Sequence, residues 1–123
     1  MYELTKEFRF DAAHTLLRDV DAEGSRRIHG HSYRAEVTLR GMPDPVSGMI
    51  IDTTILAHKL EETRNALDHR FLDEINDLGP GTMENLCAYI WRRLLPDVPA
   101  LHAVTVLRDS TADRVTYYGE AAA

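Results

Sequence analysis

The chain has 123 residues, a formal net charge of −6 and one cysteine, Cys87. This length predicts one domain over 1–123 that can bury a core without disulfides, and a lone cysteine excludes a disulfide framework within the chain. The acidic balance argues against a broad nucleic-acid surface, and no apolar run approaches the ~18 residues of a membrane span. Because the N-terminus also does not look like a signal peptide, we expect a cytoplasmic protein.

Residues 2–12 are predicted to form the first strand, because apolar side chains alternate along it. His14 follows in the same register as Phe8, Phe10 and Ala12, so its ring is expected on the apolar face of that strand. Residues 13–28 then form a long charged loop. Loops of this length inside a compact domain are usually functional.

The stretch 29–33, His-Gly-His-Ser-Tyr, opens a second predicted strand over 31–40. If the strand register extends back to its start, His29 and His31 share a face with Tyr33 and Val37. Two imidazoles on one face of a strand provide half of a zinc site, and His14 offers a third ligand. Three neutral histidines with a fourth position open are typical of a catalytic zinc. The alternative is that His29 and His31 are surface loop residues.

The second half of the chain predicts two helices followed by two strands. Thr53 is a plausible N-cap for the first helix, and Thr82 for the second. The order ββααββ is typical of an α+β architecture, in which two helices cover one face of a mostly antiparallel sheet. Self-association through sheet edges is also expected. The helices are predicted at 53–67 and 82–95, and the strands at 101–109 and 113–119.

Two further positions are candidates for chemistry. Asp68 and His69 lie together at the end of the first helix, where a carboxylate can fix the tautomer of an imidazole for acid–base catalysis. Alternatively, Asp68 caps the turn and His69 is an exposed cation at a helix end. Asp109 can bind the donor edge of a heterocycle, or it is a solvated turn residue. Cys87 is expected to be a small buried apolar residue.

Five motifs, in this order, resemble the 6-pyruvoyl tetrahydropterin synthase / 6-carboxy-tetrahydropterin synthase family. The resemblance covers the chain from about residue 5 to residue 120, and the spacing between His14 and His29 is similar to that of the bacterial 6-carboxy-tetrahydropterin synthases. The motifs are FDAAH at 10–14, HGHSY at 29–33, LDHRFLD at 67–73, GTMEN at 81–85 and YGE at 118–120.

The resemblance implies a tunnelling fold, a four-stranded antiparallel sheet with two helices on one side. Such subunits form trimers whose sheets close a barrel, and two trimers form a homohexamer with active sites between subunits. It also implies Zn²⁺ on His14, His29 and His31, which grips the side-chain oxygens of 7,8-dihydroneopterin triphosphate. A cysteine supported by the Asp68–His69 pair would move protons on the substrate side chain while triphosphate leaves.

Two positions depart from the family pattern. Ser25 stands four residues before His29, where the family has its catalytic cysteine, and a serine hydroxyl cannot be tuned into a base as a thiol can. Glu23 is nearby and is a candidate substitute, although it is not at the position where a related family branch carries a glutamate. Asp109 stands where the family anchors the pterin on a glutamate, and it is one methylene shorter.

The preferred hypothesis is therefore a zinc-dependent lyase acting on the side chain of a reduced pterin triphosphate. Its residues would be the three histidines, the Asp68–His69 relay, Ser25 or Glu23 in place of the cysteine, and Asp109 on the pterin. A second hypothesis is a paralogue that keeps zinc and a pterin-like ligand but has lost synthase chemistry. A third is a zinc hydrolase that uses metal-bound water.

Overall fold

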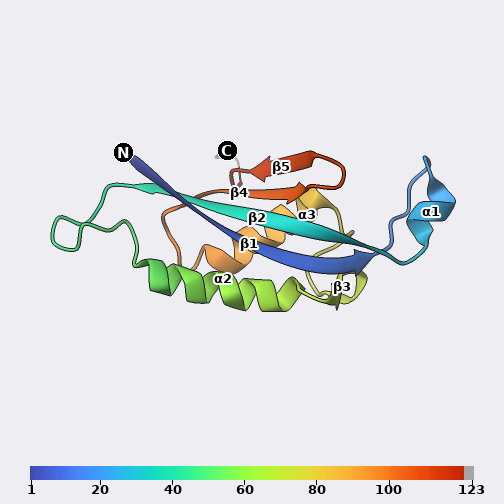
Figure 1. Ribbon diagram of the computed structural model, residues 1–123, viewed down its shortest axis with the longest axis horizontal. Coiled ribbons are helices and arrows are strands. Elements are labelled where there is room, and N and C mark those ends of the chain that lie inside the picture. Colours follow the sequence, from blue (N-terminus) through green and yellow to red (C-terminus); the bar gives the residue numbers. More distant parts are fainter. Residues whose placement is uncertain (121–123) are drawn as a thin grey trace.

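The computed structural model describes residues 1–120 as one sheet with helices packed on one of its faces (Figure 1). The α+β class expected from the sequence is confirmed. The elements, in chain order, are β1 (Tyr2–His14), α1 (Ala22–Arg26), β2 (His29–Gly41), α2 (Thr53–Leu67), β3 (Arg70–Phe71), the 3₁₀ turn η1 (Leu72–Glu74), α3 (Met83–Leu94), β4 (Leu101–Arg108) and β5 (Asp113–Tyr117).

The sheet has five strands in the order β3-β1-β2-β4-β5, one more than the sequence predicted. The additional strand, β3, is only two residues long and runs parallel to β1. It forms because the backbone N–H of His69 donates to Asp11 O at 2.7 Å, which brings the following residues alongside Ala12 and Ala13. The predicted loop 13–28 likewise contains the short helix α1.

Helices α2 and α3 cover one face of the sheet and close a continuous apolar core (Figure 1). At its centre Phe10 stacks on Tyr33 with ring centroids 5.0 Å apart. The cap of α3 is Thr82, as predicted, and its side chain accepts from Asn85 N. The cap of α2 is Asp52 rather than Thr53, because the Asp52 carboxylate accepts from Thr54 N at 2.8 Å.

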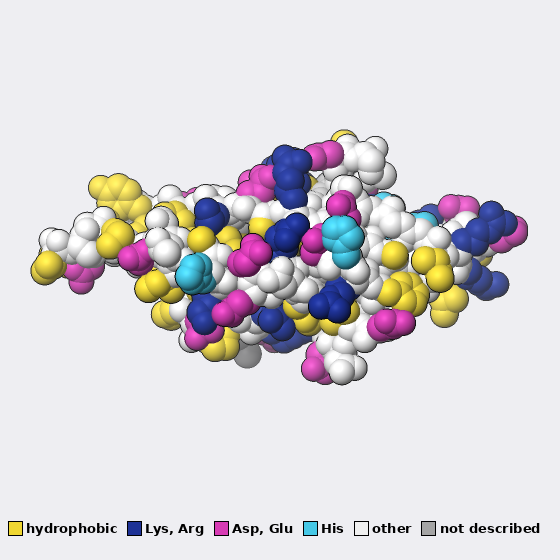
Figure 2. All heavy atoms as spheres, turned by 60° about the horizontal axis from the view of Figure 1, so that its bottom comes forward, with side chains coloured by type: hydrophobic (Ala, Val, Ile, Leu, Met, Phe, Trp, Pro, Cys, Tyr) yellow, Lys and Arg dark blue, Asp and Glu magenta, His cyan; other side chains and the backbone are white. Residues whose placement is uncertain are grey.

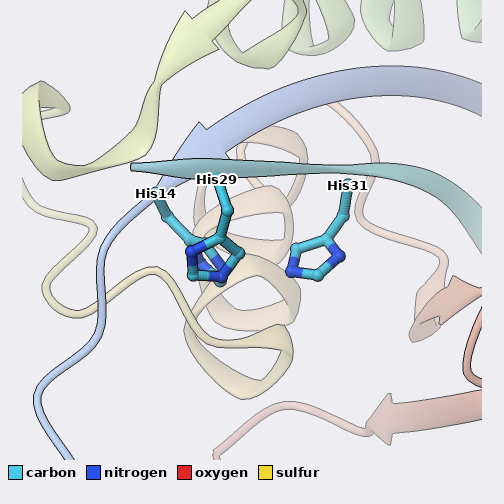
Figure 3. Close-up of side chains that lie close together, drawn as sticks. All are labelled: His14, His29 and His31. Carbon is cyan, nitrogen blue, oxygen red and sulfur yellow. The ribbon is translucent and has the colours of Figure 1, made fainter. Parts of the chain in front are cut away.

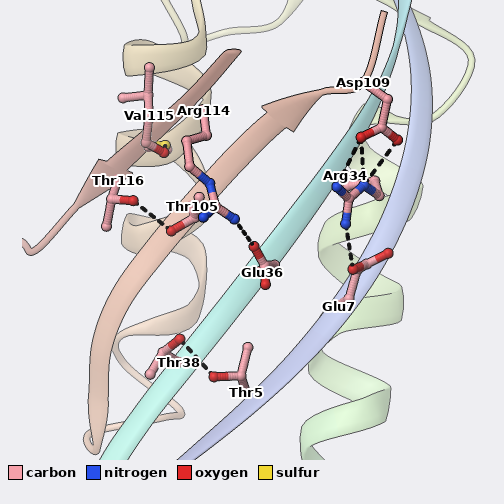
Figure 4. Close-up of polar contacts among 11 residues, drawn as sticks. Thr5, Glu7, Arg34, Glu36, Thr38, Thr105, Asp109, Arg114, Val115 and Thr116 are labelled. Carbon is pink, nitrogen blue, oxygen red and sulfur yellow. Dashed lines mark hydrogen bonds and ion pairs between the residues drawn. The ribbon is translucent and has the colours of Figure 1, made fainter. Parts of the chain in front are cut away.

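Within residues 1–120, the opposite face of the sheet carries no helix, and it is polar (Figure 4). Cross-strand side chains pair along it through hydroxyl–hydroxyl hydrogen bonds and ion pairs, which are the favourable pairings on an open sheet face. They are Thr5–Thr38 at 3.0 Å, Thr105–Thr116 at 2.8 Å, Arg34–Glu7 at 3.1 Å, Arg34–Asp109 at 2.9 Å and Arg114–Glu36 at 2.9 Å.

The side of the molecule that carries α2 shows acidic and basic side chains interspersed over its middle, without a patch of one sign (Figure 2). Exposed apolar side chains belong mainly to two loops, with Met42 and Val46 after β2, and Leu17, Val20 and Ile28 around α1. Within residues 1–120, no helix has the length and apolar character needed to cross a membrane.

Candidate metal centre

The pairing of β1 with β2 brings three histidines to one end of the sheet. His14 lies opposite His29, and Ala12 lies opposite His31, and the alternation predicted within each strand is confirmed. All three rings point toward one another from the ends of the two strands (Figure 3). Each offers one nitrogen, and these nitrogens all lie within 4.8 Å of one another. The three side chains are therefore placed so that they could hold one metal ion.

Backbone carbonyls fix the tautomers of two of these rings. His14 Nδ1 lies 2.7 Å from Gly81 O, and His29 Nδ1 lies 2.8 Å from Arg27 O. A carbonyl oxygen only accepts, so in the neutral rings both Nδ1 atoms carry the hydrogen and both Nε2 atoms keep a lone pair. Hydrogen bonding of the non-ligating nitrogen to a backbone carbonyl is also the usual support of a metal-bound histidine.

Those two Nε2 atoms lie only 2.8 Å apart. Two lone pairs this close repel unless a cation lies between them. Tetrahedral zinc with Zn–N bonds of ~2.0–2.1 Å would separate such atoms by roughly 3.3 Å, so the rings need to part by about half an ångström. The donor set thus fits a divalent ion of the zinc type.

Burial keeps two of the imidazoles, those of His14 and His31, in the neutral form that a metal requires. Desolvation lowers the pKa of His14, and His29 and Arg108 lower it further, while the bond to Gly81 partly offsets this. Desolvation, followed by the positive charge of Arg108, lowers the pKa of His31 to about 4. At neutral pH both rings therefore present lone pairs without first having to lose a proton.

The histidines line a cavity of about 430 Å³ that also contains Ser25. Ser25 is 3% exposed, and its Oγ accepts a hydrogen bond from Arg18 Nε. The structure therefore brings Ser25 to the histidines. Glu23 does not line this cavity; its side chain is 84% exposed and forms an ion pair with Arg27 at 2.7 Å.

Sequence reasoning missed Arg108, which lines the same cavity. Its Nη1 lies 3.4 Å from His31 Nε2, and its Nη2 forms an ion pair with Asp113 at 3.2 Å. A signal was available, because Val104 and Val106 are core residues of β4 and strand alternation puts residue 108 on their face. Arg18 was missed as well, because it is one charge among many in the predicted loop.

Asp109, one residue further along, is not in the cavity. It binds Arg34 on the polar face of the sheet, with Arg34 Nη2 2.9 Å from its Oδ1, and this contact lowers the pKa of the Asp109 carboxyl (Figure 4). The structure does not bring Asp109 together with the three histidines. Strand alternation explains the result, because Arg108 and Asp109 point to opposite faces.

Asp68 and His69 form a second polar site. Asp68 Oδ1 accepts from Asp11 N at 2.9 Å, and Oδ2 lies 2.8 Å from His69 Nδ1 and 3.0 Å from Arg64 Nη2. These contacts, the Asp11 bond first, lower the pKa of Asp68. The carboxylate is nearly buried and the imidazole is 79% exposed, so a fixed anion orients a ring that is open to solvent.

The Asp68–His69 pair does not line the cavity that all three histidines share. His69 lines another cavity of about 540 Å³ together with Asp11 and Ser32, whose side chains hydrogen-bond to each other, and His31 borders both cavities. Both alternate with the buried residues of their strands, so they lie on the face opposite His14 and His31. Within one chain, the pair therefore lies beside the sheet face opposite the three histidine rings, although His31 borders its cavity.

Fold and site together define an α+β domain with three histidines that could hold one metal ion. The family model described as 6-pyruvoyl tetrahydropterin synthase matches residues 3–120, so the chain belongs to that family.

Known proteins of this kind match over most of their length. The chain is 37% identical over 119 residues to a 6-carboxy-5,6,7,8-tetrahydropterin synthase of a Synechocystis strain, covering 91% of this chain and 90% of the relative. It is 35% identical to the 6-pyruvoyl tetrahydrobiopterin synthase of Poecilia reticulata, with 95% and 90% covered. The solved structure of the Caenorhabditis elegans 6-pyruvoyl tetrahydropterin synthase superposes with a TM-score of 0.85 at 29% identity, covering 97% and 96%.

Proposed function

We propose that the protein is a zinc-dependent lyase that acts on the side chain of 7,8-dihydroneopterin triphosphate or a closely related reduced pterin. The observation that carries this proposal is the 2.8 Å approach of two Nε2 lone pairs whose orientation is fixed by backbone carbonyls. His14, His29 and His31 would hold the ion. Bound there, zinc supplies Lewis-acid polarisation of the side-chain oxygens of the substrate.

Asp68 and His69 are proposed as the proton relay. The buried Asp68 carboxylate accepts from His69 Nδ1–H, which leaves His69 Nε2 exposed as the atom that takes or gives a proton. His69 is held in the left-handed region at φ 57°, and its backbone N–H is bonded to Asp11 O. The position of the ring is thus set by its backbone as well as by its carboxylate partner.

A homohexamer, a dimer of trimers, would unite the relay with the metal centre of a neighbouring chain. Two sheet edges support this assembly. Among residues 1–120, β3 pairs only with the end of β1 at Ala12 and Ala13, so the outer edge of β1 is open before that point. β5 is the other edge (Figure 1). Open edges present backbone groups that readily pair with another chain.

Ser25 occupies the position where the family resemblance implies a cysteine base. Its hydroxyl accepts from Arg18 and can donate one hydrogen bond into the cavity, but it lacks the acidity that makes a cysteine thiolate a base. We therefore propose that Ser25 positions the substrate, while proton abstraction depends on His69. Ser25 lines the cavity where a base is expected, and its hydroxyl is already bonded to Arg18. A second candidate function is therefore a pterin-binding paralogue without synthase activity.

Incubation of zinc-loaded protein with 7,8-dihydroneopterin triphosphate, followed by mass spectrometry, tests the proposal. Carboxy, pyruvoyl and hydroxymethyl pterins differ in mass, so one experiment identifies the product. Ser25→Cys should increase triphosphate elimination if the remaining groups are competent, and Ser47→Cys, in the exposed loop after β2, is the matched control. Substrate that binds but stays unchanged, even with Ser25→Cys, would favour the binding paralogue.

A further inference from the structure

Arg108 is a half-buried cation whose hydrogen bonding is incomplete. Its side chain is 21% exposed and lies at the end of β4, on the core face of the sheet. Among residues 1–120, its Nε has no hydrogen-bond partner although the atom is buried. Leaving a charged donor buried and unpaired is costly, so an unpaired guanidinium beside a cavity indicates a missing acceptor.

The existing partners of Arg108 do not fill that role. Asp113 takes Nη2 from a position that is 54% exposed. Nη1 reaches His31 Nε2 only at 3.4 Å, and a metal ion on that nitrogen would use the lone pair that Nη1 approaches. With the metal bound through His31 Nε2, two of the three guanidinium nitrogens would therefore lack an acceptor.

The surrounding charges favour an anion in this space. The cavity is lined by two guanidinium groups, Arg18 and Arg108, against one carboxylate, Asp21, among the described residues. Asp21 is already near Arg18, with 3.5 Å between Asp21 Oδ2 and Arg18 Nη2. Arg108 has no acceptor capacity, so a heterocycle that presented N–H donors to it would leave both sides unpaired.

We propose that Arg108 binds an anionic oxygen group of the ligand, a phosphate or a carboxylate, directly beside the three-histidine centre. This deepens the proposed function, on which it rests, because it states which part of the substrate faces β4. Planar guanidinium groups bind such oxyanions through paired hydrogen bonds. The ligand edge next to His31 is then an acceptor, not the donor edge of a pterin ring.

Direct binding of anions to the zinc-loaded protein tests this without requiring turnover. The probes are inorganic triphosphate, inorganic phosphate, 7,8-dihydroneopterin and 6-carboxypterin, and calorimetry measures their binding to wild type, Arg108→Gln and Arg108→Lys. Loss of the charge-assisted bonds should weaken the preferred anion about 10- to 100-fold in Arg108→Gln and less in Arg108→Lys. Arg114→Gln, which removes a paired arginine from the polar face, is the matched control.

The two ligand sources give different results. A phosphate on Arg108 makes triphosphate binding depend on Arg108 and leaves dephosphorylated 7,8-dihydroneopterin unaffected, whereas a carboxylate confines the effect to 6-carboxypterin. Equal affinity of wild type and Arg108→Gln for every probe would overturn the inference. If Arg108→Gln turns over the pterin triphosphate as fast as wild type, the inference about Arg108 fails and the lyase proposal stands. If anion binding depends on Arg108 but no turnover occurs, the inference stands and the lyase proposal fails.

Discussion

The histidine centre lies on the ends of β1 and β2, whereas the Asp68–His69 pair lies in the turn after α2, beside the opposite face of those strands, and the two sites hold charge in opposite ways. At the histidine centre, burial lowers the pKa values of His14 and His31 and keeps the rings neutral. At the pair, a backbone N–H, Arg64 and His69 lower the pKa of Asp68 and keep the carboxylate ionised. The sheet therefore separates a site suited to a metal, on its core face, from a site suited to proton transfer, beside its opposite face.

Removing one ring of the histidine centre should have the largest effect. His29→Ala eliminates one of the two Nε2 lone pairs, so zinc affinity is expected to fall by more than about 1,000-fold, because loss of an outer partner alone costs about 10–100-fold. Competition with a chromogenic chelator measures it. His58→Ala, at an exposed position of α2, is the control and should bind zinc as wild type does. Unchanged affinity in His29→Ala would show that this ring is no ligand.

Breaking the other site should leave zinc binding intact. Asp68→Asn keeps an acceptor for Asp11 N but removes the charge that orients His69, so turnover of the reduced pterin is expected to fall about 100-fold or more. Fixed-time assays of the pterin product, with zinc content measured in parallel, separate a loss of turnover from a loss of zinc. Asp97→Asn, at an exposed ion pair with Lys59, is the matched control. Equal loss of zinc in Asp68→Asn would contradict the separation of the sites.

Much of the fold could be predicted from the sequence because its hydrophobic periods are regular. The alternation of β1 and β2 predicted that His14, His29 and His31 share one face, and the pairing register agrees. β3 could not be predicted, because two residues carry no period and the strand depends on a tertiary hydrogen bond from His69 to Asp11. The α2 cap shifted by one residue because Asp and Thr are both good caps and stand side by side.

The candidate site was harder to predict where neighbouring residues point in opposite directions. The family resemblance put Asp109 on the pterin, whereas strand alternation turns Arg108, and not Asp109, into the cavity of the three histidines. Glu23 and Ser25 are likewise two residues apart, yet only Ser25 turns inward from α1. The placement of Asp68–His69 on the far face depends on the turn after α2, and sequence spacing contains no information on that turn.

A smaller effect is expected from the contact that supports His14. A Cβ at residue 81 would lie 3.2 Å from His14 Cβ and 3.3 Å from its Nδ1. Gly81→Ala should therefore displace the ring and weaken zinc binding about 10- to 100-fold, the range for an outer partner. Gly41→Ala is the control, because its Cβ would meet Ile50 at an ordinary 3.6 Å. The same chelator competition measures both, and equal affinities would show that residue 81 does not position His14.

The smallest effect is a difference in pH dependence between the two sites in chelator-treated protein. His31 has a folded pKa of about 4, below its ordinary value near 6.5, so the unfolded chain binds more protons between these values and stability falls as pH decreases through that window. Asp68 has a lowered pKa, so the stability that its ionised carboxylate contributes is present above the ordinary pKa near 3.9. That stability is lost only as the pH falls below this value. Urea unfolding from pH 7 to pH 3 should show that His31→Gln reduces the loss of stability in the upper window by about 1–2 kcal/mol, after allowance for partial exposure, while His14, whose pKa is also lowered, still contributes there. Asp68→Asn should remove only the lower step, and a variant that altered both windows would mean that the two sites are coupled within one chain.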